Sequence, residues 1–122
     1  MIYEKELSHK IVGCAFEVYN HLNHGYLEKV YENALLIEFS LNGIKAESQV
    51  PIKVIYKDHC VGDYYADIIV EDKIILELKS CLEIHPSHIA QLINYLTATG
   101  IKVGYILNFG NENKFEFKRI VK

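Results

Sequence analysis

The sequence predicts an α/β or α+β fold in which helices flank a central mixed β-sheet, with the elements in the order ααβββαββ. Three observations support this order. Two amphipathic segments open the chain, strand-like segments fill its middle and its end, and one more amphipathic segment separates the two sets of strands. The length of 122 residues predicts a single domain over residues 1–122, and a hydrophobic content of 50% is enough for a core.

Two helices are expected in the first third of the chain. Residues 4–22 carry apolar side chains at helical spacing, and Asn23-His24-Gly25 end this segment. A second helix is expected over residues 26–41, with Asn42-Gly43 as its cap. The stripes expected to be buried are Leu7, Ile11, Ala15, Val18 and Leu22 in the first helix, and Leu27, Val30, Ala34, Ile37 and Leu41 in the second.

The remainder of the chain reads as strands interrupted by one helix. Strands are expected over residues 46–56, 60–70 and 74–80. Pro86 suits the first turn of a third helix, which ends at Thr99-Gly100. Two short strands then close the chain, over residues 102–108 and 114–119.

Charge and cysteine content exclude several classes of protein. The net charge is −3 and Arg119 is the only arginine, which argues against a strongly basic nucleic-acid binder. Three separated cysteines without a Cys-x-x-Cys pair indicate neither a disulfide framework nor a zinc knuckle, and free thiols suit the cytoplasm. Because no apolar run approaches the roughly 20 residues of a membrane span, no membrane association is expected.

The segment most informative about function is residues 64–79, where two apolar strands meet at a charged turn. Asp67, Glu77 and Lys79 are set into these strands. Charges inside a buried sheet are costly unless they are paired or bound to a cation. We therefore interpret these three residues as a metal-binding functional site, with a buried structural ion pair between Glu77 and Lys79 as the alternative.

Spacing alone does not select this site, because four Glu-x-Lys triplets occur, beginning at Glu71, Glu77, Glu112 and Glu116. The first lies at the turn and the third in a polar loop. In the fourth, aromatic residues alternate with the charges, which predicts a solvated face. Only the second lies in a strand that is apolar on both faces.

The site makes a specific prediction about strand register. If Asp67 lies opposite Glu77, the connecting loop must be the three residues 71–73, and both carboxylates share one face. A two-residue turn would place them on opposite faces. With the odd loop, Ile69 is expected opposite Ile75 and Tyr65 opposite Lys79 on the carboxylate face, and the other face is expected to hold Ala66, Ile68, Val70, Ile74, Leu76 and Leu78.

At this point the chain resembles a known family. Gly25, Glu28 and Tyr31 match the Gly-x-x-Glu-x-x-Tyr signature of the GxxExxY proteins, which belong to the PD-(D/E)XK nuclease-like superfamily. The resemblance continues, nearly over the full length, through Val50-Pro51, Tyr65-Ala66-Asp67, Glu77-Leu78-Lys79-Ser80, residues 88–96 and residues 106–110. Gln91-x-x-x-Tyr95 also resembles a motif of RecB-like nucleases. The sequence departs from the family at Tyr65, where an arginine is frequent.

This resemblance implies a restriction-endonuclease-like core whose middle hairpin carries the acids. Asp67 and Glu77, with the main-chain carbonyl of Leu78, would bind Mg²⁺ or Mn²⁺, and Glu28 would complete the acidic cluster. Lys79 would orient or activate the attacking water.

Further roles are implied for the third helix, where Gln91 and Tyr95 would steady the site or contact a phosphate. Without the family, the shared helical face of Glu28, Tyr31 and Glu32 is equally consistent with a solvated face.

The resulting hypothesis is a metal-dependent nuclease that hydrolyses phosphodiester bonds in nucleic acid, with DNA as the expected substrate. The alternative is a catalytically silent module of the same fold that binds nucleic acid or a partner protein. A homodimer is a further expectation, because so small a domain grips few base pairs.

Overall fold

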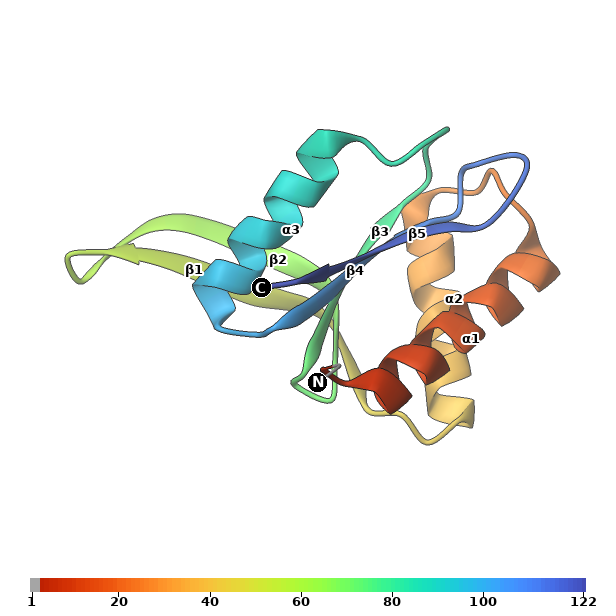
Figure 1. Ribbon diagram of the computed structural model, residues 1–122, viewed down its shortest axis with the longest axis horizontal. Coiled ribbons are helices and arrows are strands. Elements are labelled where there is room, and N and C mark those ends of the chain that lie inside the picture. The colour runs from red at the N-terminus through yellow and green to blue at the C-terminus, as the bar shows by residue number, and fades with distance from the viewer. Residues whose placement is uncertain (1–2) are drawn as a thin grey trace.

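The computed structural model describes residues 3–122, in which five strands and three helices follow one another in the predicted order (Figure 1). The elements are α1 (Lys5–Leu22), α2 (Glu28–Leu41), β1 (Ala46–Tyr56), β2 (His59–Val70), β3 (Ile74–Lys79), α3 (Pro86–Thr99), β4 (Val103–Asn108) and β5 (Glu116–Val121). Helix α2 begins two residues later than expected, because Gly25 has a φ of 110° and Leu27 is extended.

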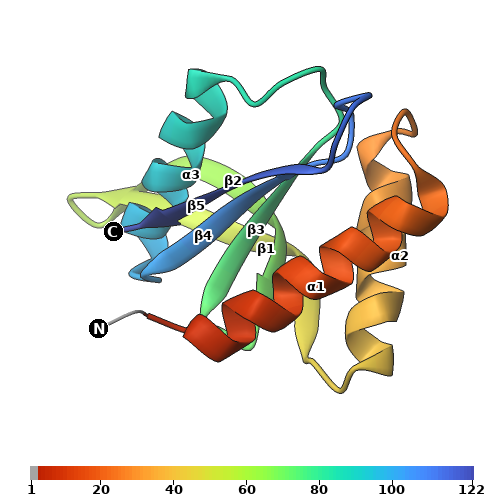
Figure 2. The same ribbon diagram turned by 45° about the vertical axis from the view of Figure 1, so that its right-hand side comes forward.

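The five strands form one mixed sheet in the order β1-β2-β3-β4-β5. Neighbouring strands are antiparallel except β3 and β4, which run parallel and are joined by α3 as the crossover. Helices α1 and α2 cover one face of the sheet and α3 covers the other (Figure 2). The predicted architecture of a mixed sheet between helices is therefore confirmed.

Each face of the sheet has its own hydrophobic core. Under α1 and α2, the strands contribute Ile68, Val70, Ile74, Leu76, Leu78, Val103, Tyr105 and Leu107. Under α3, the buried residues are Ile52, Ala66, Ile69, Ile75, Leu92, Tyr95, Leu96 and Ile106. Strand β3 is covered on both faces, which explains its almost unbroken apolar sequence.

The buried face of α2 differs from the expected one. Tyr31, Leu35 and Phe39, which are four positions apart, form the stripe that packs in the core, whereas Leu27, Val30, Ile37 and Leu41 are exposed and Ala34 is only partly buried.

One assignment of faces in the strands was also wrong. Ala66 lies in the core under α3, whereas it was expected beside Ile68 under the other helices. The side chains of β1 also change from one face of the sheet to the other near Ala66. Ala46 packs against the core under α1 and α2, whereas Val50, four residues later, packs against the core under α3. The change occurs at Gln49, whose φ of 52° interrupts the regular alternation of the paired strands.

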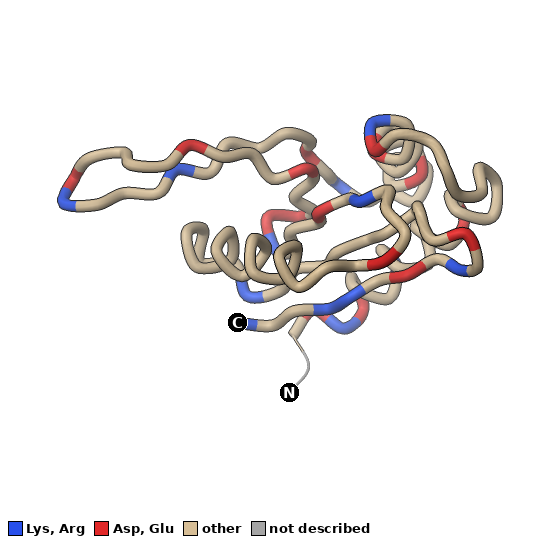
Figure 3. The backbone as a smooth tube through the Cα atoms, turned by 90° about the horizontal axis from the view of Figure 1, so that it is seen from above, with Lys and Arg blue, Asp and Glu red and all other residues tan. Residues whose placement is uncertain are grey.

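The β1–β2 hairpin extends beyond the rest of the molecule as a long arm (Figures 1 and 3). Its turn residues Lys57 and Asp58 have φ values of 48° and 65°, as in the two-residue turns that match the twist of a hairpin. Strand β1 is an edge of the sheet and contains Pro51. Among the helices of residues 3–122, none combines the length and apolarity that crossing a membrane requires.

Candidate active site

The β2–β3 hairpin has the predicted register. Val70 pairs with Ile74 and Ile69 with Ile75, across a turn of three residues. The turn is closed by the main-chain N–H of Lys73, which donates to the carbonyl of Val70 at 2.9 Å. The odd loop therefore brings Asp67 and Glu77 together, as expected.

Asp67 and Glu77 join the two strands through their carboxylates. The main-chain N–H of Asp67 donates to Oε2 of Glu77 at 2.9 Å, and the N–H of Leu78 donates to Oδ2 of Asp67 at 2.8 Å. The regular pairing of the strands ends one step earlier, at Ile68 and Leu76. Since side-chain oxygens accept these N–H groups, the sheet opens here around two carboxylates.

The opening of the sheet also corrects the prediction made for Tyr65. Tyr65 was expected opposite Lys79, but no β2–β3 pair beyond Ile68 and Leu76 forms among residues 3–122. Tyr65 pairs with Pro51 on the other side of its strand, and its side chain is exposed.

The two carboxylates are poorly solvated and close to each other. Glu77 is only 5% exposed, and burial followed by the charge of Asp67 raises its pKa to about 8. Burial likewise raises the pKa of Asp67, although the N–H of Leu78 opposes that shift. The buried Glu77 and the half-buried Asp67 repel each other when both are ionised, and a divalent cation would stabilise this arrangement.

Lys79 supplies positive charge beside this pair. It lies two residues after Glu77 on β3, is half-buried, and lowers the pKa values of both Asp67 and Glu77. Within residues 3–122, no ion pair closes between Lys79 and either carboxylate. The structure therefore does not contain the structural ion pair between Glu77 and Lys79 that was the alternative interpretation.

Helix α3 brings the two residues expected from it to the same place. The side-chain amide of Gln91 donates to the Tyr95 hydroxyl at 3.0 Å. Tyr95 is buried, and its pKa is raised first by burial and then by the charges of Glu77 and Asp67. Its hydroxyl is therefore close to the carboxylate pair.

Helix α2 contributes two acids in different environments. Glu28 is exposed, but its charge helps to raise the pKa of Glu77. Glu32 is 3% exposed and accepts from Lys29 at 2.5 Å and from the Gln49 amide at 2.7 Å. Helical spacing had placed both acids on one face without showing which is buried.

Glu32 and Gln49 also act on the site itself. The charge of Glu32 raises the pKa of Asp67, whereas a hydrogen bond from Gln49 lowers it. Gln49 was not identified from the sequence. In the sequence, Gln49 differs from its neighbours only in being a polar residue within a strand, at the position where β1 changes faces.

Tyr31 has a structural role in the loop before α2. The Tyr31 hydroxyl donates to the carbonyl of Asn23 at 2.5 Å and accepts from the N–H of Tyr26 at 3.2 Å. The hydroxyl of Ser80, directly after β3, donates to the carbonyl of Tyr26 at 2.5 Å. These contacts tie the loop before α2 to the end of β3 and thereby position the first turn of α2, which carries Glu28.

The segment that follows Lys79 is fixed by the fully buried Asn108 at the end of β4. Its amide oxygen accepts from the N–H groups of Cys81 and Gly110, both at 3.0 Å, and its amide nitrogen donates to Cys81 and Glu116. Glu116 was expected on a solvated face, but it also accepts from the N–H of Ile84 at 3.1 Å. The sequence contains no clear signal for this network.

The donor set fits a hard divalent cation. Asp67, Glu77 and the Leu78 carbonyl offer oxygen ligands, which suit Mg²⁺ or Mn²⁺. Across the described part of the chain, no three His, Cys, Asp or Glu side chains gather in a way that would hold an ion by themselves. Mg²⁺ is commonly bound by one or two carboxylates together with water and substrate phosphates, and the pair of Asp67 and Glu77 fits that mode of binding.

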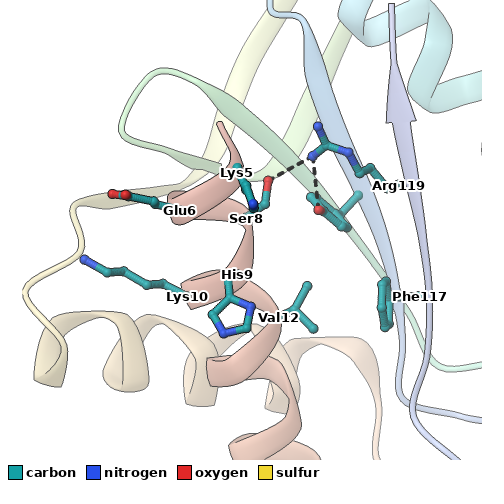
Figure 4. Close-up of a pocket in the computed structure, with 9 residues that line it drawn as sticks. Lys5, Glu6, Ser8, His9, Lys10, Val12, Phe117 and Arg119 are labelled. Atoms are coloured by element: carbon teal, nitrogen blue, oxygen red, sulfur yellow. Dashed lines mark hydrogen bonds between the residues drawn. The ribbon is translucent and has the colours of Figure 1, made fainter. Parts of the chain in front are cut away.

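A separate cavity of about 670 Å³ lies between α1 and the β4–β5 strands and contains none of the predicted site residues (Figure 4). On its wall, Arg119 donates to the Ser8 hydroxyl at 2.9 Å and to the Tyr105 hydroxyl at 3.2 Å. The guanidinium also donates to the carbonyl of Tyr3 at 2.8 Å. The sole arginine thus fixes α1 to the sheet, away from the carboxylates.

Comparison with known proteins agrees with this geometry. A family model described as the PD-(D/E)XK nuclease superfamily matches residues 5–120. Among solved structures, the crystal structure of SSO0001 has a similar fold, with a TM-score of 0.58 and 18% sequence identity. The match covers 77% of this chain and 49% of that one, so this chain spans about half its length. No curated protein matches the sequence. The predicted restriction-endonuclease-like architecture is consistent with these findings.

Proposed function

Because the chain belongs to the PD-(D/E)XK nuclease superfamily, we propose that it is a metal-dependent nuclease that hydrolyses phosphodiester bonds in nucleic acid, with DNA as the expected substrate. The observation that carries this proposal is the cross-bonded carboxylate pair at the opening of the sheet, formed by the half-buried Asp67 and the buried Glu77. Two further side chains lie beside the pair: Lys79, which carries a positive charge, and Tyr95, whose hydroxyl can form hydrogen bonds.

We assign the binding of Mg²⁺ or Mn²⁺ to Asp67, Glu77 and the Leu78 carbonyl, with Glu28 as an outer acid. When bound, such a cation neutralises charge on phosphoryl oxygens and lowers the pKa of coordinated water. Glu28 contributes from the edge of the site, because its side chain is exposed.

The remaining site residues act on the substrate and on the attacking water. Lys79 places positive charge where the scissile phosphate would bind and holds the water by its ammonium protons. The amide of Gln91 donates to the oxygen of the Tyr95 hydroxyl. Tyr95 can therefore direct its own proton toward a phosphate oxygen.

We also propose that the chain is a GxxExxY protein within the superfamily. Each of the signature residues has a distinct structural role, which supports this proposal. Gly25 adopts a positive φ, Tyr31 holds the preceding loop, and Glu28 stands at the edge of the site.

A second candidate function is a catalytically silent module that binds nucleic acid or a partner protein. The observation that favours it is the engagement of Arg119, the sole arginine, in internal hydrogen bonds in a chain of net charge −3. No guanidinium is then left for bidentate contacts to phosphate, and the negative net charge does not attract a polyanion. A homodimer would enlarge the binding surface, and the free cysteines Cys14, Cys60 and Cys81 suit the reducing cytoplasm that we propose.

One experiment separates the two functions. Purified protein is incubated with single-stranded, duplex and branched DNA and with RNA, in Mg²⁺, Mn²⁺ or EDTA. Glu77→Ala and Lys79→Ala are compared with Glu112→Ala and Lys114→Ala, a matched Glu-x-Lys triplet in an exposed loop. We expect metal-dependent cleavage that falls about 100-fold or more only in the first two variants. Binding that persists in Glu77→Ala, with no cleavage by the parent protein, would indicate the silent module.

A further inference from the structure

A groove of about 600 Å³ runs between the β1–β2 arm and α3. It is lined by Val54 and Tyr64 from the arm, and by Ser87, Ala90, Gln91, Asn94, Tyr95, Thr97 and Ala98 from the helix. Gln91 and Tyr95 are also residues of the candidate active site, so the groove begins where the proposed chemistry takes place.

The groove is electrically neutral. None of the residues that line it within the described chain is Lys, Arg, Asp or Glu. Helix α3 carries none of these residues along its whole length, as its uniformly tan tube shows (Figure 3). A phosphate backbone requires cations or N–H donors along its path, and a wall of small neutral side chains does not attract it.

Tyr64 gives the groove an aromatic wall. Its side chain is 46% exposed, and its ring centroid lies 5.8 Å from that of Tyr95. The ring lies over Gly62, because a Cβ atom there would come within 3.0 Å of Tyr64 Cε2 and 3.3 Å of Val54 Cβ. The glycine therefore provides room for the Tyr64 ring at the mouth of the groove.

The groove combines a partly exposed aromatic ring with the side-chain amides of Gln91 and Asn94. A planar ring system with a hydrogen-bonding edge matches both features, since bases stack on aromatic side chains and bond to amides. We infer that this groove holds an unpaired nucleobase adjacent to the scissile phosphate. The inference rests on the proposed function, because it takes nucleic acid as the ligand.

This inference specifies the class of substrate. A base inside a regular duplex is stacked and paired, and it would reach the groove only at the cost of unstacking and unpairing, so the groove favours bases that are already unpaired. The substrate is therefore single-stranded nucleic acid, or a duplex that contains unpaired nucleotides. The volume is within the range of pockets that enclose small organic ligands.

The test measures binding in EDTA, where the proposed cleavage does not occur. Oligonucleotides carry 2-aminopurine, whose fluorescence falls when the base stacks on an aromatic ring, and they are supplied as single-stranded DNA, single-stranded RNA and fully paired duplex. Tyr64→Ala is compared with Tyr64→Phe, which keeps the ring, and with Tyr56→Ala, an exposed tyrosine of the same arm outside the groove. Asn94→Ala is added because alanine favours the helix, so weaker binding by this variant cannot reflect lost helix stability.

For single strands, we expect Tyr64→Ala to weaken binding about 10- to 100-fold and to abolish the quenching, because one stacked base is removed. Asn94→Ala should weaken binding less, and Tyr64→Phe and Tyr56→Ala should match the parent protein. Equal binding by Tyr64→Ala and the parent protein would overturn the inference. The occupant of the groove would then be a peptide or a second copy of the chain. Undiminished cleavage of single strands by Tyr64→Ala in Mg²⁺ would also overturn it, while supporting the proposed nuclease. Tyr64-dependent quenching without any cleavage would support the groove and argue against the nuclease.

Discussion

The rings of Tyr31 and Phe109 lie almost parallel, with their centroids 4.4 Å apart and their planes at 9°. Both side chains are fully buried, so the stack joins α2 to the residue that follows β4. One side of the stack holds the loop before Glu28, and the other adjoins Asn108, which holds the segment after Lys79. Tyr31 thus supports the site from a position inside the core.

Tyr31→Phe should keep this stack and lose the two hydrogen bonds of the hydroxyl. Because the carbonyl of Asn23 and the N–H of Tyr26 lose their partner, we expect the free energy of unfolding to fall by about 1–3 kcal/mol. Urea unfolding measures the change. Tyr56→Phe, on the exposed tip of the arm, should be nearly neutral, and an equally small effect at Tyr31 would contradict the role assigned to its hydroxyl.

Stability should depend on pH through Glu77. Its pKa is about 8 in the folded protein, against an ordinary value of 4.5, so the folded state binds more protons than the unfolded state between these values. In the absence of divalent cations, the free energy of unfolding should therefore fall as pH rises from about 4.5 to about 8, and the raised pKa of Asp67 acts in the same direction. Thermal unfolding should show this slope reduced in Glu77→Gln and retained in Glu112→Gln.

Divalent cations should restore the stability that the protein loses as pH rises. Mg²⁺ or Mn²⁺ at about 100 times its dissociation constant should stabilise the protein by about 2.7 kcal/mol, through preferential binding to the folded state. The gain in Tm should be larger at about pH 8 than at about pH 5, since the cation competes with the protons on Asp67 and Glu77. An identical gain in Glu77→Gln would place the ion elsewhere.

Two glycines should respond in opposite ways to alanine. A Cβ atom on Gly110 would lie 2.1 Å from the main-chain nitrogen of Cys81, so Gly110→Ala should destabilise the protein by about 1–3 kcal/mol or more. Gly13 lies within α1 with nothing near its Cβ position, so Gly13→Ala should stabilise by about 0.5–1 kcal/mol. Chemical denaturation of both variants provides the comparison, and a tolerated Gly110→Ala would show that the segment at Cys81 is not tightly held.

Glu32→Gln should lower the pKa of Asp67. The buried carboxylate of Glu32 raises that pKa by its charge, and glutamine removes the charge at nearly constant volume. NMR titration of the ¹³C-labelled aspartate carboxyl groups follows the shift. Glu47→Gln, an exposed position on β1, should leave the Asp67 titration in place. Identical Asp67 titrations in Glu32→Gln and the parent protein would show that the two acids do not interact.

The sequence was sufficient to predict the order of the elements and the pairing of Ile69 with Ile75, because burial on both faces of β3 restricts where charged residues can lie. It was not sufficient for Tyr65, because the end of regular pairing depends on carboxylates that accept main-chain N–H groups, which strand periodicity does not encode. The contact between Gln49 and Glu32 could not be predicted either, because these residues are 17 positions apart and lie on different elements, which the periodicity of each element does not relate.

The parallel pairing of β3 with β4 across α3 has a consequence for the order of folding. Asp67 and Glu77 are ten positions apart on one hairpin, so their association closes a short loop. Gln91 and Tyr95 reach them only when the crossover helix docks and β4 joins the sheet, which is the non-local and therefore slower step. Pulse-labelled hydrogen exchange during refolding should find the amides of the β2–β3 hairpin protected before those of β4. During that interval the acids would be assembled while the residues of α3 were still absent, so a newly made chain would acquire its acidic pair before the side chains that complete the site around it.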